Sequence, residues 1–140
     1  MVSMRPRKAR LDVLLTLLAA ISLWLAGIAV GDQPNKPCRE HPKLIGPCFT
    51  VHARMRYYNG APSVRLWPVG TNRLLGVSEG QFEVSGYETL PQSFRETLDS
   101  QREIYADFVV CPFTPDEVAV MRLVCVDSAT NIVRKSVAAW

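Results

Sequence analysis

Two alternating segments joined by an Asn-Gly pair constrain the fold of this chain more than any other feature. In residues 48–58 nearly every second position is apolar, and mostly polar side chains fill the positions between. The apolar face consists of Phe49, Val51, Ala53, Met55 and Tyr57. This period of two is typical of a β-strand with one buried face. Asn59-Gly60 follows and Ser63–Trp67 alternates again, so the sequence predicts an antiparallel hairpin.

The length of the hairpin loop decides which side chains share a face. A loop of two residues (Asn59-Gly60) or of four, extended through Pro62, places Met55 and its apolar neighbours beside Val64 and Leu66 in a core. A loop of odd length would bring arginines there instead, which is far more costly because charged groups would be buried. The opposite face then collects a basic and aromatic set, which consists of His52, Arg54, Arg56, Arg65 and Trp67.

The rest of the chain predicts three more strands and one short helix. The strand segments are Arg73–Val77, Ile104–Cys111 and Val118–Val126, and the tail 131–133 is a candidate for another edge. Between the third and fourth strands, Leu90, Phe94 and Leu98 recur at helical spacing. Pro91 suits the first turn of a helix there.

This order of elements predicts the fold class. Five strands with a helix between the third and the fourth is the order of an OB-type barrel. We therefore expect a mainly β domain, built as a small five-stranded antiparallel OB-like barrel with one short helix. The alternative is a small open antiparallel sheet with one helix.

Residues 1–31 have the layout of a membrane-targeting leader. Four basic residues in Met1–Arg10 precede Val13–Val30, a run of eighteen residues without a charge, and we expect this run to form a hydrophobic leader helix. A signal-peptide core is about 7–15 residues long and a membrane span takes about 20. The run therefore fits both a cleaved signal peptide and an uncleaved N-terminal membrane anchor. In either case the rest of the chain is exported.

The leader also predicts how the remaining residues are organised. Residues 32–47 contain four prolines and form a Pro-rich linker by composition, and residues 48–140 form a single β-rich exported domain. The chain has 16 basic and 13 acidic residues. The leader holds four of the basic residues and one of the acidic residues, so residues 32–140 have no net charge. A neutral domain lacks the field of a nucleic-acid binder, so we expect no nucleic acid as a partner and membrane contact through the leader only.

Four cysteines follow the leader: Cys38, Cys48, Cys111 and Cys125. An even number in an exported domain predicts two disulfides. The most local pairing, Cys38 with Cys48 and Cys111 with Cys125, is favoured, but it needs a wide loop across 112–118; otherwise a bridge runs to another strand. Cys-x-x-Cys spacing does not occur and the histidines do not surround a cysteine pair, so we expect no metal site.

Motifs of catalysis are missing from the sequence. It contains no Gly-x-Ser-x-Gly, no His-Glu-x-x-His and no phosphate-binding loop, so we expect no catalytic residues, no cofactor and no enzymatic activity. His52 and Asp107 would make a base and its orienting carboxylate only if the first and fourth strands bring them together.

The basic and aromatic hairpin face is the candidate binding site. Arginines beside a tryptophan can bind an anion, a carboxylate or an aromatic group. The alternative is that this face is the solvated side of a strand, whose arginines pair with acids such as Glu79, Glu83 or Asp107.

Five segments carry a resemblance to other proteins. They are residues 48–54 (Cys-Phe-Thr-Val-His-Ala-Arg), 58–67, 70–77, 106–112 and 121–129, together a little under a third of the chain. They resemble a group of uncharacterised exported bacterial proteins to which no activity is assigned. The resemblance implies a bacterial envelope setting and supplies no catalytic residue. Ala53 stands where that group is expected to have glycine.

Together these features predict an exported cell-envelope protein, in the periplasm or anchored in the inner membrane. We expect a non-enzymatic binding or interaction module whose hairpin face contacts an envelope protein, a glycan or a small anionic ligand. One alternative is a membrane-anchored structural or assembly partner of an envelope complex. Another is an unrecognised hydrolase, for which the sequence shows no site.

Overall fold

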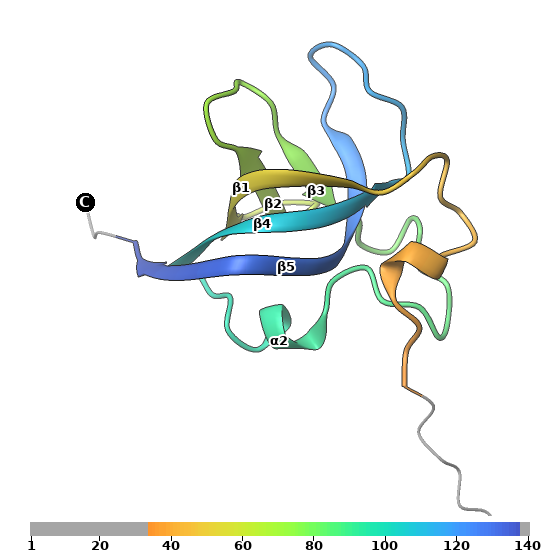
Figure 1. Cartoon of the computed structure of the whole chain (residues 1–140), viewed down its shortest axis with the longest axis horizontal. Helices are drawn as coiled ribbons and strands as arrows, with labels where there is room; N and C mark the ends of the chain where they lie inside the picture. The colour runs from red at the N-terminus through yellow and green to blue at the C-terminus, as the bar shows by residue number, and fades with distance from the viewer. Residues whose placement is uncertain (1–33, 138–140) are drawn as a thin grey trace, which may run out of the picture. The chain divides into compact units, whose positions relative to one another are not determined.

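Five β-strands hold the core of residues 34–137, the part of the chain that this computed structural model describes (Figure 1). They are β1 (Phe49–Tyr57), β2 (Val64–Pro68), β3 (Leu75–Val77), β4 (Arg102–Pro112) and β5 (Arg122–Ser136). A 3₁₀ turn, η1 (Cys38–Glu40), precedes them, and one short α-helix, α2 (Gln92–Arg95), lies between β3 and β4. The described residues are therefore mainly β, as predicted.

The sheet is mixed rather than fully antiparallel. Its strands are hydrogen-bonded in the order β1-β2-β3-β5-β4, and β4 also pairs with β1, so every strand has two neighbours. β3 and β5 run parallel, with Gly76 opposite Leu123, whereas the other pairs are antiparallel. The predicted antiparallel arrangement is wrong in this respect. In a closed ring of five strands, neighbouring strands cannot all be antiparallel, because an odd number of strands leaves at least one parallel pair.

The β1–β2 hairpin has the predicted register, with the four-residue loop. Met55 lies opposite Leu66, and the backbone N–H of Tyr58 donates to the carbonyl of Ser63 at 2.7 Å. Ala53, Met55 and Leu66 are fully buried. The even loop length therefore places the apolar side chains inside and the arginines outside.

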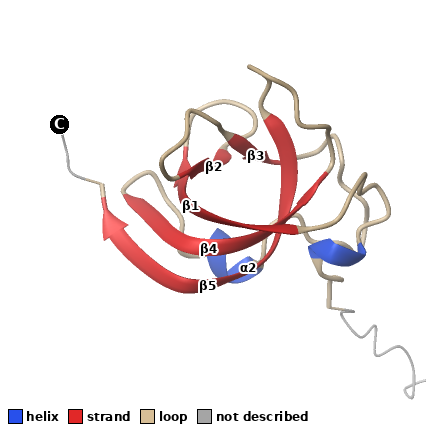
Figure 2. Cartoon of the chain, turned by 45° about the horizontal axis from the view of Figure 1, so that its top comes forward, coloured by secondary structure: helices blue, strands red, loops and turns tan. Residues whose placement is uncertain are grey.

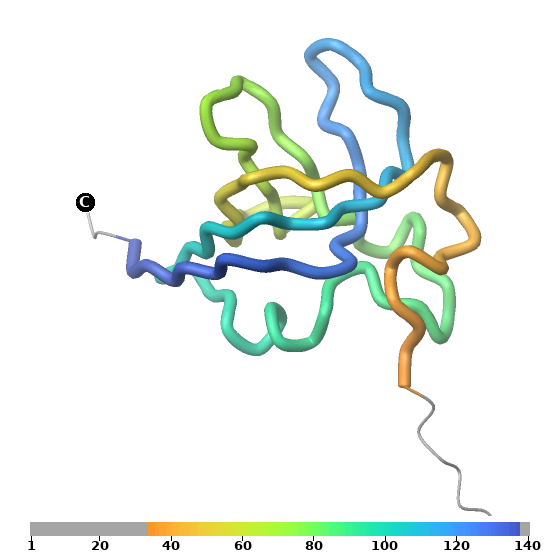
Figure 3. The backbone as a smooth tube through the Cα atoms, in the orientation of Figure 1, coloured from red at the N-terminus to blue at the C-terminus, as the bar shows by residue number. Residues whose placement is uncertain are grey.

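The predicted helix is confirmed, although α2 is only about one turn long. Pro91 is its N-cap, Leu90 and Phe94 are buried, and Leu98 packs against the core. The ring of Phe94 lies 5.9 Å from that of Phe108 on β4. Figure 2 shows α2 beside β4 and β5. The loops 69–74 and 113–121 leave the sheet on the side away from α2 (Figure 3).

β4 and β5 form a longer ribbon than the sequence predicts. β4 begins at Arg102, and β5 begins four residues later than expected but continues to Ser136. The tail 131–133 is thus part of β5 and not a further edge strand. Its side chains are exposed, so hydrophobic alternation does not reveal it; backbone pairing with β4 holds it, with register shifts after Tyr105 and Val109.

The two disulfides do not follow the favoured local pairing. Cys48 bonds to Cys111 and Cys38 bonds to Cys125, with Cα atoms 4.1 Å and 5.8 Å apart. Cys48 directly precedes β1 and continues its register with β4 to a position opposite Cys111. Cys125 is also opposite Cys111, on β5, but the sulfur of Cys111 is already bonded, and η1 supplies Cys38 instead. The local pairing is therefore wrong.

The Pro-rich segment packs against the strands from Cys38 onward. Cys38 and His41 are buried, and the Ile45 N–H donates to the Pro112 carbonyl at 3.0 Å. Arg39 donates from its backbone N–H and its guanidinium to Asp127 on β5, with Nε 3.0 Å from Oδ1. All described residues consequently belong to one compact unit.

The predicted leader, residues 1–31, lies outside the described residues, as does the choice between a cleaved signal and an anchor. Within residues 34–137, none of the helices has the length and apolar character needed to cross a membrane.

Candidate ligand-binding face

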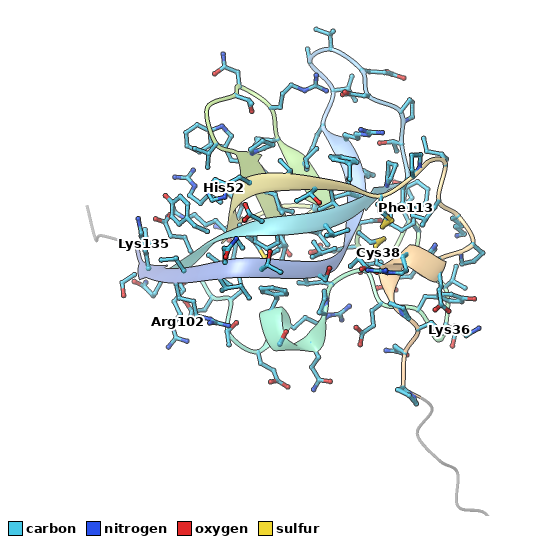
Figure 4. The ribbon with its side chains drawn as sticks, in the orientation of Figure 1. Lys36, Cys38, His52, Arg102, Phe113 and Lys135 are labelled. Carbon is cyan, nitrogen blue, oxygen red and sulfur yellow. A yellow bond between two sulfur atoms is a disulfide. The ribbon has the colours of Figure 1, made fainter. Side chains whose placement is uncertain are left out.

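The structure brings the predicted site residues together on the outer face of the β1–β2 hairpin. Arg54 is opposite Trp67, and Arg56 is opposite Arg65. His52 lies on the same face of β1, where Figure 4 labels it. His52 and Trp67 are exposed and the three arginines are half-buried. We call these five residues the hairpin face.

Arg54 and Trp67 form a stacked pair on the hairpin face. The Arg54 guanidinium carbon lies 4.5 Å from the centroid of the Trp67 ring, and Trp67 Nε1 donates to the Thr71 carbonyl at 2.5 Å. The indole is thus held by β1 and by the loop after β2. Arg54 Nη1 lies 3.9 Å from Oε2 of Glu103 on β4, so part of its charge is balanced within the protein.

Arg56 and Arg65 form a pair of like charges beside Tyr58. Their guanidinium carbons lie 5.9 Å and 5.1 Å from the centroid of the Tyr58 ring, and Arg65 Nε donates to the Pro62 carbonyl at 3.0 Å. Neither arginine forms an ion pair with a carboxylate of the described residues. Like charges directly opposite each other are unfavourable, and a bound anion would relieve the repulsion.

A groove runs along the face toward the loop 69–74. It has a volume of about 390 Å³ and is lined by Arg54, Tyr58 and Trp67, with Asn72, Arg73 and Leu74 on its other side. Tyr58 and this loop lie outside the set of five residues that the sequence indicates. Tyr58 was identifiable in principle, because it continues the even-numbered polar face of the strand by one step.

His52 is oriented by a carboxylate, because β1 and β4 are neighbours. His52 and Asp107 are opposite each other, and His52 Nδ1 donates to Asp107 Oδ1 at 2.8 Å. Asn131 Nδ2 donates to Asp107 Oδ2 at 2.6 Å. These hydrogen bonds, the one from Asn131 foremost, lower the pKa of Asp107 and keep it a charged acceptor at neutral pH.

The chemistry available to His52 follows from these contacts. Its Nε2 atom is left unengaged by Asp107, on a side chain that is 57% exposed. Among the described residues, no hydroxyl or thiol group is hydrogen-bonded to His52. The pair therefore offers a positioned hydrogen-bonding group to a ligand, but not the base-and-nucleophile contact of covalent catalysis.

The face continues from β1 onto β4 and β5. Tyr105 is opposite Arg54, and the ammonium of Lys135 lies 4.5 Å from the centroid of the Tyr105 ring. Glu103 is opposite both Arg56 and Lys135. None of the acids that the sequence suggested as arginine partners pairs with Arg54, Arg56 or Arg65 in this part of the chain; Glu103 pairs with Arg54 instead.

The outer face of β3 is closed to ligands by the protein itself. A Cβ atom built on Gly76 would lie 2.5 Å from Cγ of Pro62 and 2.8 Å from Sδ of Met121. The β1–β2 and β4–β5 loops therefore meet over β3. A ligand of this face can reach β1, β2 and the loop 69–74, but not β3.

Three cysteine sulfur atoms lie as close to one another as the ligands of a metal ion do. The Sγ atoms of Cys38, Cys111 and Cys125 lie within 4.8 Å of one another. All three are in disulfides and are not thiolates, which are the ligands that zinc requires from cysteine.

Comparison of the chain with models of protein families, with curated proteins and with solved structures gave no match.

Proposed function

We propose that this chain is an exported cell-envelope protein whose domain is an OB-type barrel that binds an acidic ligand through the hairpin face, without catalysis. The ring of strands, with α2 placed between β3 and β4, supports the assignment to the OB type. OB-type barrels bind ligands on the outer face of their second and third strands and on adjoining loops. Here β2 and the loop 69–74 fill that role.

The observation that carries the proposal is the pairing of Arg56 with Arg65. Two guanidinium groups without an acidic partner in the described part of the chain suit a carboxylate, sulfate or phosphate, which accept two parallel hydrogen bonds from each arginine. Tyr58 and Trp67 beside them offer ring faces on which the apolar side of a sugar can pack. An acidic sugar meets both features, so we propose an acidic glycan as the ligand.

The export of the domain rests on separate support. Two disulfides are consistent with an oxidising compartment. The leader predicted for residues 1–31 and the resemblance to uncharacterised exported bacterial proteins support the periplasm or cell envelope as its location. An uncleaved leader would anchor the chain in the inner membrane.

Titration with two matched sugars tests the binding proposal. Glucuronate and glucose share a ring and differ in the carboxylate, and NMR shifts of the Trp67 indole N–H report binding to each. We expect glucuronate to bind more tightly, and the double variant Arg56→Ser/Arg65→Ser to lose about tenfold or more in affinity, since charge-assisted hydrogen bonds are removed.

Arg102→Ser/Arg134→Ser is the matched control. Both are exposed arginines on the β4–β5 ribbon outside the hairpin face, so their loss removes the same number of charges without touching the site. An unchanged glucuronate affinity in Arg56→Ser/Arg65→Ser, or an equal loss in Arg102→Ser/Arg134→Ser, would contradict the proposal.

A second candidate, a structural or assembly partner of an envelope complex, is favoured by the end of β5. Ile132 and Val133 are 38% and 51% exposed, on a stretch of β5 that is paired with β4 alone. An Ile132→Ser/Val133→Ser variant that loses an envelope protein co-purifying with the parent chain would support this candidate.

A further inference from the structure

A second hollow lies away from the hairpin face, between the first residues of β2, the end of β3 and the segment around α2. It has a volume of about 210 Å³. Its apolar wall is formed by Val64, Val77, Leu90 and Leu98, which come from β2, β3 and both sides of α2. The volume is below the range of about 300–1,000 Å³ that is usual for drug-sized ligands, so a ligand here is small.

Ser78 gives this cavity an unsatisfied polar group. The residue is 1% exposed, and its backbone N–H donates to the Val124 carbonyl at 2.9 Å. Ser78 is one of the residues that line the cavity, and its side-chain Oγ is buried without a hydrogen-bond partner among the described residues. A buried hydroxyl without a partner is unfavourable, and a polar atom of a ligand would supply the missing hydrogen bond.

The remaining polar residues give the cavity a negative balance. Glu79 and Glu83 line it together with a single cation, Arg95. Arg95 Nε donates to the Leu90 carbonyl at 3.0 Å, and Glu79 Oε1 accepts from the backbone N–H of Ser63 at 3.1 Å and from the Ser63 hydroxyl, which leaves Glu79 Oε2 for a ligand. No ion pair forms between Arg95 and either glutamate within residues 34–137. Two carboxylates with one guanidinium favour a cationic head group.

We propose that this cavity is a binding site for a small amphiphilic amine. The ammonium group of the amine donates to Ser78 Oγ and to the glutamates, and its apolar chain packs against the apolar wall. An ammonium group carries three donors and no acceptor, which matches one unsatisfied hydroxyl oxygen and two carboxylates. The site is independent of the hairpin face, since the two share no lining residue.

Three probes of equal chain length test the site: pentylamine, 1-pentanol and pentanoate. Each probe is titrated into the full chain with its disulfides intact, and the NMR shifts of the Val77 and Leu90 methyl groups are followed. We expect pentylamine to bind most tightly and pentanoate about tenfold or more weakly than the amine, because the carboxylate meets Glu79 and Glu83. Equal affinity for the three probes would overturn the proposal.

Variants separate the contributions of the hydroxyl and the carboxylates. Ser78→Ala is expected to weaken pentylamine several-fold, whereas Ser100→Ala, at an exposed serine outside the cavity, leaves the affinity unchanged. Glu83 is exposed, so Glu83→Gln keeps the fold and is expected to weaken the amine more than the alcohol. Parent-like amine affinity in Glu83→Gln and Ser78→Ala, or shifts at Trp67 in place of Val77 and Leu90, would overturn the site.

Discussion

At the scale of single residues, the packing around His41 determines the pKa and the charge state of its imidazole ring. Its ring meets those of Phe113 and Tyr87 edge-on, with centroids 4.8 Å and 5.3 Å away, and its Nδ1 accepts from the Lys43 N–H at 3.2 Å. Burial lowers the pKa of His41, and the Phe82 carbonyl acts in the opposite direction. His41 is therefore neutral in the folded protein at neutral pH.

We expect the free energy of unfolding to decrease as the pH falls below about 6.5. The unfolded chain takes up a proton at His41 near that pH, but the folded chain does so only at a lower pH, so acid favours the unfolded state in this window. Urea unfolding between about pH 7.5 and pH 5 measures the effect. His41→Phe, which keeps an aromatic ring in the cluster, should flatten this dependence.

Two carboxylates with lowered pKa values provide the internal comparison. Asp107 and Asp127 stabilise the folded chain above their unfolded pKa of 3.8, and this contribution is lost only as the pH falls below that value. Their effect therefore lies outside the window of His41. A slope in His41→Phe as steep as in the parent chain would show that His41 is not its cause.

At the scale of elements, β3 depends on a glycine whose missing side chain makes room for two loops. Gly76 pairs with Arg65 and Leu123 on its two neighbours, and Pro62 and Met121 lie directly over it. Leu75 and Val77 on either side of Gly76 are buried in the core, so a shift of this three-residue strand would also disturb their packing.

Gly76→Ala is expected to lower the free energy of unfolding by about 1–3 kcal/mol, since the added methyl group must displace Pro62 or Met121. Urea unfolding measures the loss. Gly46→Ala is the matched control, because a Cβ there meets its nearest neighbour, Pro112, at an ordinary 3.7 Å. Equal stability of the two variants would show that the loops do not press on β3.

At the scale of the whole molecule, the disulfides link η1 to β5 and the residue before β1 to β4. Cys38 and Cys125 are 87 residues apart in sequence, and Cys48 and Cys111 are 63 apart. Long closed loops restrict the unfolded chain strongly, so each bridge is expected to contribute about 2–4 kcal/mol.

Paired serine substitutions test both the pairing and its effect. Cys38→Ser/Cys125→Ser and Cys48→Ser/Cys111→Ser should each lower the free energy of unfolding by about that amount and leave the other bridge intact. Peptide mapping without reduction should recover Cys38 linked to Cys125 and Cys48 linked to Cys111. Recovery of Cys38 linked to Cys48 would contradict the observed register.

The hairpin illustrates what local pattern can predict. The alternation in β1 and β2 and an even loop length were enough to place Arg54, Arg65 and Trp67 on one outer face, because side chains in strands alternate strictly. Helical spacing with Pro91 likewise located α2. Residues 131–136 carry no such pattern, since both faces of this part of β5 are exposed, and only pairing with β4 holds them in a strand.

By itself, the sequence determined the mainly β class, the hairpin and its two faces, because these follow from contacts between residues close along the chain. The tertiary structure decided the parallel pairing of β3 with β5, the disulfide partners, the closure of β3 by Pro62 and Met121, and the meeting of His52 with Asp107. Each of these depends on which strands become neighbours. That choice comes from packing the entire ring, and no local pattern encodes it.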